Sequence, residues 1–258
     1  MSGTQNVAAG VVLTLLAATL VVWLVRAVRR SPYTPRQSLV YAGNVLLTRV
    51  LWRARVPARL PIPLGQGAVL VANHRSSVDP FFIQLAAHRV VYWMVAREYF
   101  AHWALGWFLR TTEAIPTRRT GLDTAATLTA IRLAASGEVL GVLPEGRINT
   151  TDELLLPARP GAVLIALRAR VPIVPCYIDG APYAGTYWSP FFLPARVRVV
   201  FGQPIDLSAH QGRERDEQLL RELTLDVMRQ IAHLAGRDDF QPRLAGRRWL
   251  GEGGSGEG

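Results

Sequence analysis

The sequence predicts an α/β fold with a largely parallel or mixed central sheet flanked by helices, preceded by an N-terminal membrane helix. Three observations indicate this architecture. Short apolar runs alternate with helical patterns from residue 67 onward, an uncharged stretch occupies residues 7–25, and a Pro-containing connection at residues 57–63 precedes the alternating region. A chain of 258 residues is long enough for one sizeable core with an anchor, and short for two full domains.

The uncharged stretch at residues 7–25 is rich in Val, Leu and Ala and predicts the membrane helix. As a helix it is roughly 29 Å long, which matches the hydrocarbon thickness of a bilayer. A cleaved signal peptide is the alternative, but residues 1–6 contain no Lys or Arg, whereas Arg26, Arg29 and Arg30 follow the stretch. The positive-inside rule then places the rest of the chain on the cytoplasmic side of the cell membrane, with single-pass or monotopic insertion.

A second apolar stretch, residues 38–48, is too short to span a bilayer. It is followed by Arg49, Trp52, Arg53 and Arg55, and an apolar segment that ends in Arg and Trp suits a helix lying at the membrane surface. An ordinary helix packed on the following domain explains the pattern equally well. We expect a transmembrane anchor at residues 1–30 and a membrane-proximal amphipathic helix with a linker at 31–60. An α/β domain is expected at 61–240 and a flexible tail at 241–258.

The alternating region contains five apolar runs with strand character, at residues 67–73, 90–96, 138–143, 172–178 and 196–201. Helical patterns are expected at residues 80–87, 100–109, 122–136, 161–170 and 214–235. The clearest is 122–136, where apolar residues recur near a spacing of 3.6 and Gly137 follows as a stop signal. Strands that alternate with helices predict a largely parallel sheet.

Charge and cysteine content limit the kinds of partner and site. The formal net charge is +10, and the basic residues are all Arg, which suits an anionic partner such as nucleic acid, anionic lipid, an acidic carrier protein or a phosphorylated small molecule. We find no basic helix or nucleic-acid-binding motif and expect no nucleic acid. Cys176 is the only cysteine, so neither an intrachain disulfide nor a cysteine-based metal cluster is possible, and the histidines show no metal-ligand spacing.

The first candidate site is the segment Val-Ala-Asn-His-Arg-Ser-Ser-Val-Asp-Pro at residues 71–80. His74 follows a predicted strand and precedes a predicted helix, and this edge of an α/β sheet is where ligands bind. His74 and Asp79 meet only if the chain folds back in the turn, and Pro80 suits a first helical turn. A carboxylate on one imidazole nitrogen would leave the other free to take a proton from an attacking hydroxyl. The alternative is a polar turn residue and an ordinary N-cap.

The pattern Asn-His-x4-Asp resembles the signature of the glycerolipid acyltransferase family, which includes 1-acyl-glycerol-3-phosphate O-acyltransferase. Further blocks resemble this family in order. Residues 113–119 read Glu-Ala-Ile-Pro-Thr-Arg-Arg, residues 142–148 read Val-Leu-Pro-Glu-Gly-Arg-Ile, and residues 171–175 and 199–205 resemble its later apolar blocks. Two departures stand out, since Glu113 replaces the usual Gly and Arg147-Ile148 replaces the common Thr-Arg.

The resemblance implies a glycerol-3-phosphate acyltransferase-like fold and roles for particular residues. His74 would be the base and Asp79 its partner, Arg119, or else Arg118, would bind the acceptor phosphate, and Glu145, Gly146 and Arg147 would contact substrate. The implied reaction moves a fatty acyl group from acyl-CoA or acyl-carrier protein to a lysophospholipid in the membrane, needing no metal or other cofactor. Lysophosphatidate is the expected acceptor. Another lysolipid, such as lysophosphatidylethanolamine or a lyso-aminolipid, and an inactive lipid-binding homologue are the alternatives.

Overall fold

The computed structural model describes residues 11, 14–15, 18–19, 31–118 and 123–246. The chain forms two compact units, residues 1–43 and 44–258. Most of the membrane helix predicted at residues 7–25 lies outside the described residues and stays a prediction. Within the described part of the chain, no helix has the length and apolar character needed to cross a bilayer.

The helix expected at residues 38–48 is present as α2 (Pro35–Leu46), which runs on into a π-helical turn, η1 (Leu47–Leu51). It begins before the expected residue because Thr34 and Gln37 form a capping box. The Gln37 amide donates to the Thr34 hydroxyl oxygen over 3.3 Å, and Gln37 Oε1 accepts from the Thr34 amide over 2.9 Å. In the first unit, Tyr33 also stacks on Tyr41 with ring centroids 4.8 Å apart.

The second unit is built on a six-stranded sheet with the order β3-β2-β4-β1-β5-β6. The strands are β1 (Ala68–Ala72), β2 (Val91–Ala96), β3 (Ile115–Thr117), β4 (Val139–Val142), β5 (Ile173–Asp179) and β6 (Arg198–Phe201). All neighbouring pairs are parallel except β5 and β6. The predicted mixed sheet is therefore confirmed, with β6 as its antiparallel edge.

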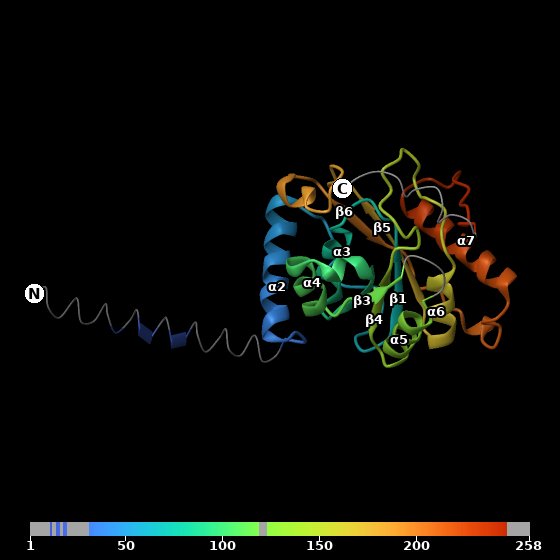
Figure 1. The fold of residues 1–258 in the computed structure, drawn as a ribbon, viewed down its shortest axis with the longest axis horizontal. Helices are drawn as coiled ribbons and strands as arrows, with labels where there is room; N and C mark the ends of the chain where they lie inside the picture. The colour runs from blue at the N-terminus through green and yellow to red at the C-terminus, as the bar shows by residue number, and fades with distance from the viewer. Residues whose placement is uncertain (1–10, 12–13, 16–17, 20–30, 119–122, 247–258) are drawn as a thin grey trace, which may run out of the picture. The chain divides into compact units, whose positions relative to one another are not determined.

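Helices cover both faces of this sheet (Figure 1). On one face, α5 (Thr124–Ala135), α6 (Gly161–Ala169) and α7 (Glu217–Leu234) pack with Val69 and Val71 of β1. On the other face, α3 (Asp79–Ala87) packs with Leu70 and other residues of β1. Because successive side chains of a strand point to opposite faces, a strand between two helical layers is apolar throughout, and β1 is buried at every residue.

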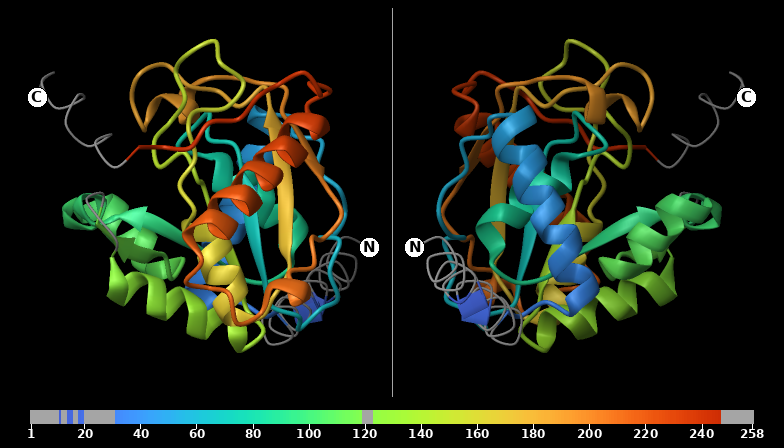
Figure 2. Two further views of the ribbon diagram at one scale, coloured as in Figure 1. Left: turned by 90° about the vertical axis from the view of Figure 1, so that its right-hand side faces the viewer. Right: turned by 90° about the vertical axis from the view of Figure 1, so that its left-hand side faces the viewer.

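Two elements differ from the sequence prediction. The helix expected at residues 100–109 is divided into a 3₁₀ turn, η2 (Arg97–Ala101), and α4 (Trp103–Thr111), because the His102 ring caps α4 by accepting from the Leu105 amide. Strand β3 was not predicted. Figure 2 shows β3 and α4 at one end of the sheet, away from β5 and β6.

The boundary predicted at residue 61 falls inside the second unit. Trp52 is fully buried in the core with Phe82 and the strands, and its indole N–H donates to the carbonyl of Pro190 over 2.9 Å. Residues 44–60 are therefore part of the same compact unit as the sheet.

The strand order creates one position where a ligand crevice is expected. Strands β1 and β4 are neighbours, but the chain leaves β1 for α3 on one face and leaves β4 toward α6 on the other. The connections that follow two such strands lead to opposite faces of the sheet and leave a crevice between them. This arrangement is a topological switch point, where α/β proteins bind ligands. Here the strands end just before His74 and Glu145.

Candidate active site

His74 and Asp79 form the ion-pair geometry that the sequence predicts. His74 Nδ1 lies 2.9 Å from Asp79 Oδ2, and the side chain of Asp79 is fully buried while that of His74 is 16% exposed. In a neutral imidazole whose Nδ1–H donates to the carboxylate, Nε2 is the basic nitrogen. The partly exposed ring is thus oriented by a carboxylate that solvent does not reach.

The loop between the two residues is closed around the same carboxylate oxygen. Asp79 Oδ2 also accepts from the amides of Arg75 and Ser76, over 2.7 and 2.8 Å. The N-cap residue of α3 is Val78 and not Asp79, so the interpretation of Asp79 as an ordinary N-cap is wrong. The Ser76 and Ser77 hydroxyls donate to the carbonyls of Pro182 and Tyr187, which fixes the loop against the segment after β5.

A second pair in the same chain shows how little the spacing alone specifies. His233 and Asp238 have the same separation in sequence, and His233 Nδ1 lies 2.6 Å from Asp238 Oδ1. Their side chains are 66% and 76% exposed and lie at the end of α7. Burial of the carboxylate at the carboxyl end of β1 is what distinguishes His74 and Asp79.

Glu145 holds the backbone at the site. Its side chain is buried, and Oε1 accepts from the amide of His74 over 2.8 Å while Oε2 accepts from the amide of Leu156 over 2.9 Å. Burial raises the pKa of Glu145 to about 7, and the two amide hydrogen bonds oppose that shift. The Asn149 amide donates to the carbonyl of His74 over 2.7 Å, so the loop after β4 contacts both sides of the His74 peptide.

The other residues of the third block lie on the turn after β4. Gly146 has φ of +69°, a conformation that L side chains rarely adopt, and both Gly146 and Arg147 are exposed. The structure therefore places Arg147 at the surface of the same loop that positions His74.

The second block is described only in part. Arg119 lies outside the described residues, and the neighbouring Arg118 is exposed, with its amide donating to Asp123 Oδ2 over 3.0 Å. Glu113 has φ of +57°. The backbone thus keeps the left-handed conformation favoured by the glycine usual at this position, although the side chain is a glutamate.

A polar cavity of about 540 Å³ has Arg75, the residue after His74, in its wall. Its wall includes Arg75, Asn149, Tyr177, Asp179 and Tyr183. The Arg75 guanidinium is fixed by Nη1, which donates to the carbonyls of Asn149 and Thr151 over 3.1 and 2.7 Å. Sequence reasoning missed Arg75, although its place directly after His74 was a signal.

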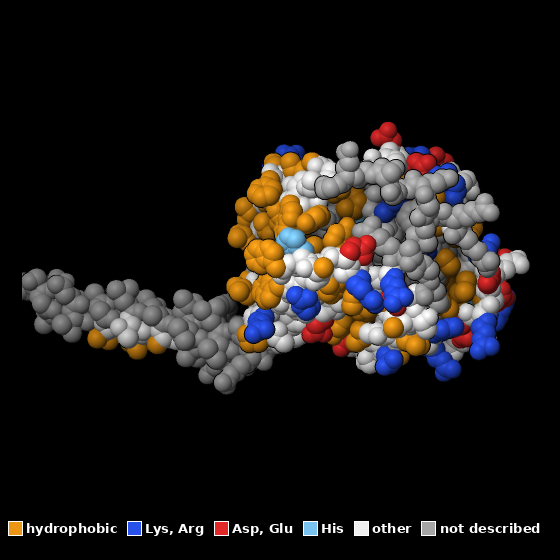
Figure 3. Space-filling view, viewed as in Figure 1, with side chains coloured by type: hydrophobic (Ala, Val, Ile, Leu, Met, Phe, Trp, Pro, Cys, Tyr) orange, Lys and Arg blue, Asp and Glu red, His pale blue; other side chains and the backbone are white. Residues whose placement is uncertain are grey.

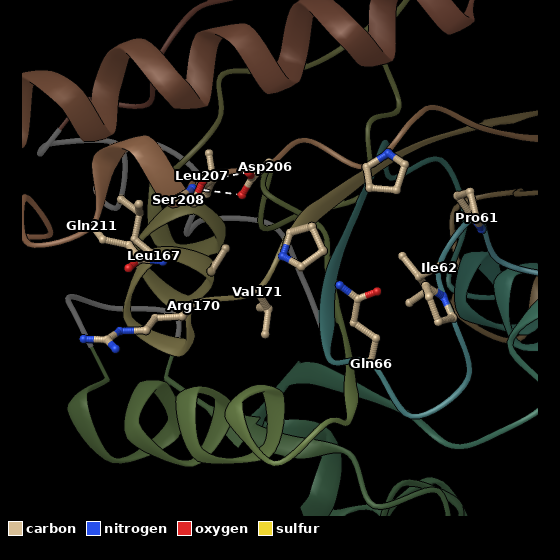
Figure 4. A pocket seen from close by; sticks show the side chains of 14 residues that line it. Pro61, Ile62, Gln66, Leu167, Arg170, Val171, Asp206, Leu207, Ser208 and Gln211 are labelled. Atoms are coloured by element: carbon tan, nitrogen blue, oxygen red, sulfur yellow. Dashed lines mark hydrogen bonds between the residues drawn. The ribbon is translucent and has the colours of Figure 1, made fainter.

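A second cavity, of about 320 Å³, lies elsewhere (Figure 4). It is bounded by Pro61, Gln66, Arg170 and Ser208 among others, and neither His74, Asp79 nor Glu145 lines it. These three residues do not line the 540 Å³ cavity either, but its wall includes Arg75, which follows His74 in the chain, and Asn149, whose amide donates to the carbonyl of His74, so we associate that cavity with the candidate active site.

Comparison with known proteins bears on the family of this chain. A family model described as Acyltransferase matches residues 53–179. This range contains His74, Asp79 and Glu145, and also Arg75 and Asn149 of the cavity wall. The chain is 27% identical to the 1-acyl-sn-glycerol-3-phosphate acyltransferase of Bacillus subtilis (strain 168), over 56% of this chain and 69% of that enzyme. Residues 53–179 form an acyltransferase domain of this family. The family and enzyme class predicted from the sequence, an O-acyltransferase like 1-acylglycerol-3-phosphate acyltransferase, are confirmed.

Two further similar proteins match a larger part of this chain. An uncharacterized protein of Mycobacterium tuberculosis (strain ATCC 25618 / H37Rv) is 30% identical over 76% of this chain, which spans 63% of that protein. The crystal structure of the 1-acyl-sn-glycerophosphate (LPA) acyltransferase PlsC from Thermotoga maritima matches with a TM-score of 0.58 at 21% identity, covering 92% of this chain and 99% of the other. That likeness shows the shared fold.

Proposed function

We propose that this acyltransferase moves a fatty acyl group from acyl-CoA or acyl-carrier protein to the free hydroxyl of 1-acyl-sn-glycerol-3-phosphate, giving phosphatidic acid. The observation that carries the proposal is the 2.9 Å contact of His74 Nδ1 with the buried carboxylate of Asp79 at the switch point of the sheet. A base in this arrangement needs no protein nucleophile, because the acceptor brings its own hydroxyl.

The reaction follows from this geometry. The acceptor oxygen attacks the thioester carbonyl carbon while His74 Nε2 takes the hydroxyl proton, and Asp79 stabilises the imidazolium that forms. The carbon–sulfur bond then breaks, the thiolate leaves, and the imidazolium returns its proton to the sulfur. The products are the ester and the free thiol. Glu145 acts as a positioning residue in this scheme, since both of its oxygens accept backbone amides.

We assign the acceptor phosphate to arginine side chains. Guanidinium groups bind phosphate through paired donors, and a fixed phosphate holds the hydroxyl beside the base. Arg119 and Arg147 take this role on the family pattern. Arg75 adds a third cationic group, on the wall of the cavity next to His74.

One observation favours a second acceptor. The cavity wall carries the Asp179 carboxylate as well as the Arg75 guanidinium. A headgroup with both a phosphate and an ammonium, as in lysophosphatidylethanolamine, matches this pair better than a bare phosphate does. The same base and the same bond changes apply to that acceptor.

We further propose that the enzyme works at the cytoplasmic side of the cell membrane, where a lysolipid acceptor and its product reside. The support is the uncharged stretch at residues 7–25 and the arginines that follow it.

The test uses membranes that contain the wild-type chain, His74→Ala or His233→Ala. Labelled oleoyl-CoA is supplied with lysophosphatidate, lysophosphatidylethanolamine and other lysolipids, and the diacyl product is followed by thin-layer chromatography. We expect product with the wild type and His233→Ala, and none with His74→Ala. His233 is a matched control because its ring also contacts an aspartate five residues on. No product from any acceptor, with acyl-carrier protein also tried as donor, would favour the lipid-binding alternative.

A further inference from the structure

Two surface segments of the second unit carry no carboxylate, Lys or Arg side chain. Residues 99–109 and 180–195 contain no Asp, Glu, Lys or Arg, although the whole chain has a formal charge of +10. Both segments are rich in aromatic residues. Trp103 is 83% exposed, Trp107 49%, Trp188 39% and Phe192 80%. Exposed tryptophans in this number are costly for a surface that meets only water.

Ring contacts join the two segments into one surface. The His102 ring lies 6.2 Å from Trp103 and 5.9 Å from Trp188, and Trp188 lies 6.0 Å from Phe191, measured between ring centroids. We call the surface formed by His102, Trp103, Trp107, Trp188 and Phe192 the aromatic face. Figure 3 shows hydrophobic side chains gathered over the part of the domain that holds α4, with basic side chains below them.

We propose that the aromatic face contacts the lipid bilayer directly, so that the catalytic domain has a membrane-binding surface of its own. Tryptophan prefers the boundary between headgroups and acyl chains, because its ring is apolar and its N–H is polar. The proposal rests on the proposed function for its choice of a lipid partner.

The charges at the margins fit an anionic lipid surface. Exposed arginines flank both segments, with Arg97 and Arg110 around the first and Arg196 after the second. Two exposed acidic residues also adjoin the segments, Glu98 before the first and Asp179 before the second, against these three arginines. Basic side chains around an apolar centre suit anionic headgroups around an inserted aromatic group.

The aromatic face is continuous with the structure that holds the dyad. Phe81, two residues after Asp79, packs against Phe108 of α4 and Phe191, with ring centroids 5.5 and 5.9 Å away. The hydroxyl of Ser77 donates to the carbonyl of Tyr187 over 2.8 Å, next to Trp188. A bilayer that touches the aromatic face therefore meets segments that pack directly on the loop between His74 and Asp79 and on the first turn of α3.

The first experiment measures whether the aromatic face lies in the bilayer or in water, and it does not depend on enzyme activity. The full chain with Trp103→Cys is labelled with an environment-sensitive fluorophore, and Glu222→Cys on the exposed side of α7 is the control. The native Cys176 is fully buried and stays unlabelled. In proteoliposomes with a quarter of anionic lipid, nitroxide-labelled lipid is the membrane quencher and iodide the aqueous one.

We expect lipid nitroxide to quench the label at position 103 at least threefold more than the label at position 222, and iodide to do the reverse. Equal quenching by lipid at both positions would overturn the proposal. A label at position 103 that responds to protein concentration and not to lipid would identify a second copy as the occupant, which also overturns it. These results do not depend on which acceptor the enzyme uses.

A second measurement links the face to catalysis. Trp103→Glu combined with Phe192→Glu is expected to lower kcat/KM at least tenfold for an acceptor embedded in anionic vesicles. With a short-chain acceptor dissolved as monomers, the change is expected to stay below twofold. An equal loss with both acceptors would show damage to the site and would contradict membrane contact.

Discussion

Asp79→Asn separates the charge of the carboxylate from its hydrogen-bond geometry. Oδ2 accepts from His74 Nδ1 and from two amides, whereas the buried Oδ1 has no partner among the described residues. The asparagine therefore places its carbonyl oxygen at Oδ2 and its amide nitrogen at Oδ1. The tautomer of His74 is kept, and the charge that stabilises the imidazolium is lost.

The size of the effect follows from the contact. Unit charges about 4 Å apart attract by about 4 kcal/mol at an effective dielectric constant near 20, so kcat is expected to fall roughly 100- to 1,000-fold. The two amides exchange a charged acceptor for a neutral one and the new amide nitrogen is buried without an acceptor, which lowers the free energy of unfolding by about 3 kcal/mol.

The assay compares kcat, both KM values and urea unfolding for the wild type, Asp79→Asn and the control Asp238→Asn. Asp238 makes the same contact to a histidine at the surface, where an ion pair contributes little. We expect the control to match the wild type in every value. Turnover by Asp79→Asn within threefold of the wild type would refute the assigned role of the carboxylate.

Three further predictions follow from the site and the core. Arg119→Ala is expected to raise the KM for a phosphorylated acceptor at least tenfold with little change for the thioester, and an unchanged acceptor KM would place the phosphate site elsewhere. The pKa of Glu145 is raised from 4.5 to about 7. Its contribution to the free energy of unfolding is therefore greatest below pH 4.5 and falls by about 3 kcal/mol as the pH rises to 7. Glu145→Gln is expected to remove this decrease, which urea unfolding at pH 5 and pH 8 measures for the wild type and the variant. Gly141→Ala should lower the free energy of unfolding by about 2 kcal/mol, because a Cβ there lies 2.5 Å from the Trp93 ring; Gly161→Ala, which meets no atom within 4 Å, is the control, and equal effects would contradict the packing argument.

The sequence was sufficient for the strands that are buried on both faces. Strand β1 is apolar at every position, and β5 is apolar up to Ile178 and ends at the exposed Asp179, so both runs are visible without knowledge of their partners. Strand β3 has three residues, one of which is Pro116, and it lies at the edge of the sheet. A short edge strand with a proline gives no local signal, because its formation depends on pairing with β2.

The sequence leaves open whether the aromatic residues at 103 and 107 are buried in a core or contact the membrane. Trp103 and Trp107 have helical spacing, and such a stripe usually indicates a core. In the structure both are exposed, and Phe108 is the residue of α4 that packs on Phe81. Spacing gives the face of a helix that is apolar, and only the neighbouring elements decide whether that face is covered.

Site prediction succeeded where the interaction is local and failed where it is distant. The contact of His74 with Asp79 spans five residues and follows from a turn. The two amides that Glu145 accepts belong to residues 71 positions before it and 11 after it, and no pattern around Glu145 points to them. The sequence predicts that Glu145 contacts substrate, whereas in the structure its carboxylate accepts two backbone amides.

This placement of Glu145 bears on attempts to give the enzyme a new acceptor. Both of its oxygens already accept backbone amides, one of them that of His74. Most substitutions at this position would therefore displace the imidazole of His74, and a library randomised there would return mainly inactive variants. The rim of the 540 Å³ cavity offers a better target. Tyr183 and Asp179 border that cavity, and within the described residues neither is hydrogen-bonded to the dyad, so a selection for altered headgroup preference is best begun with those two side chains.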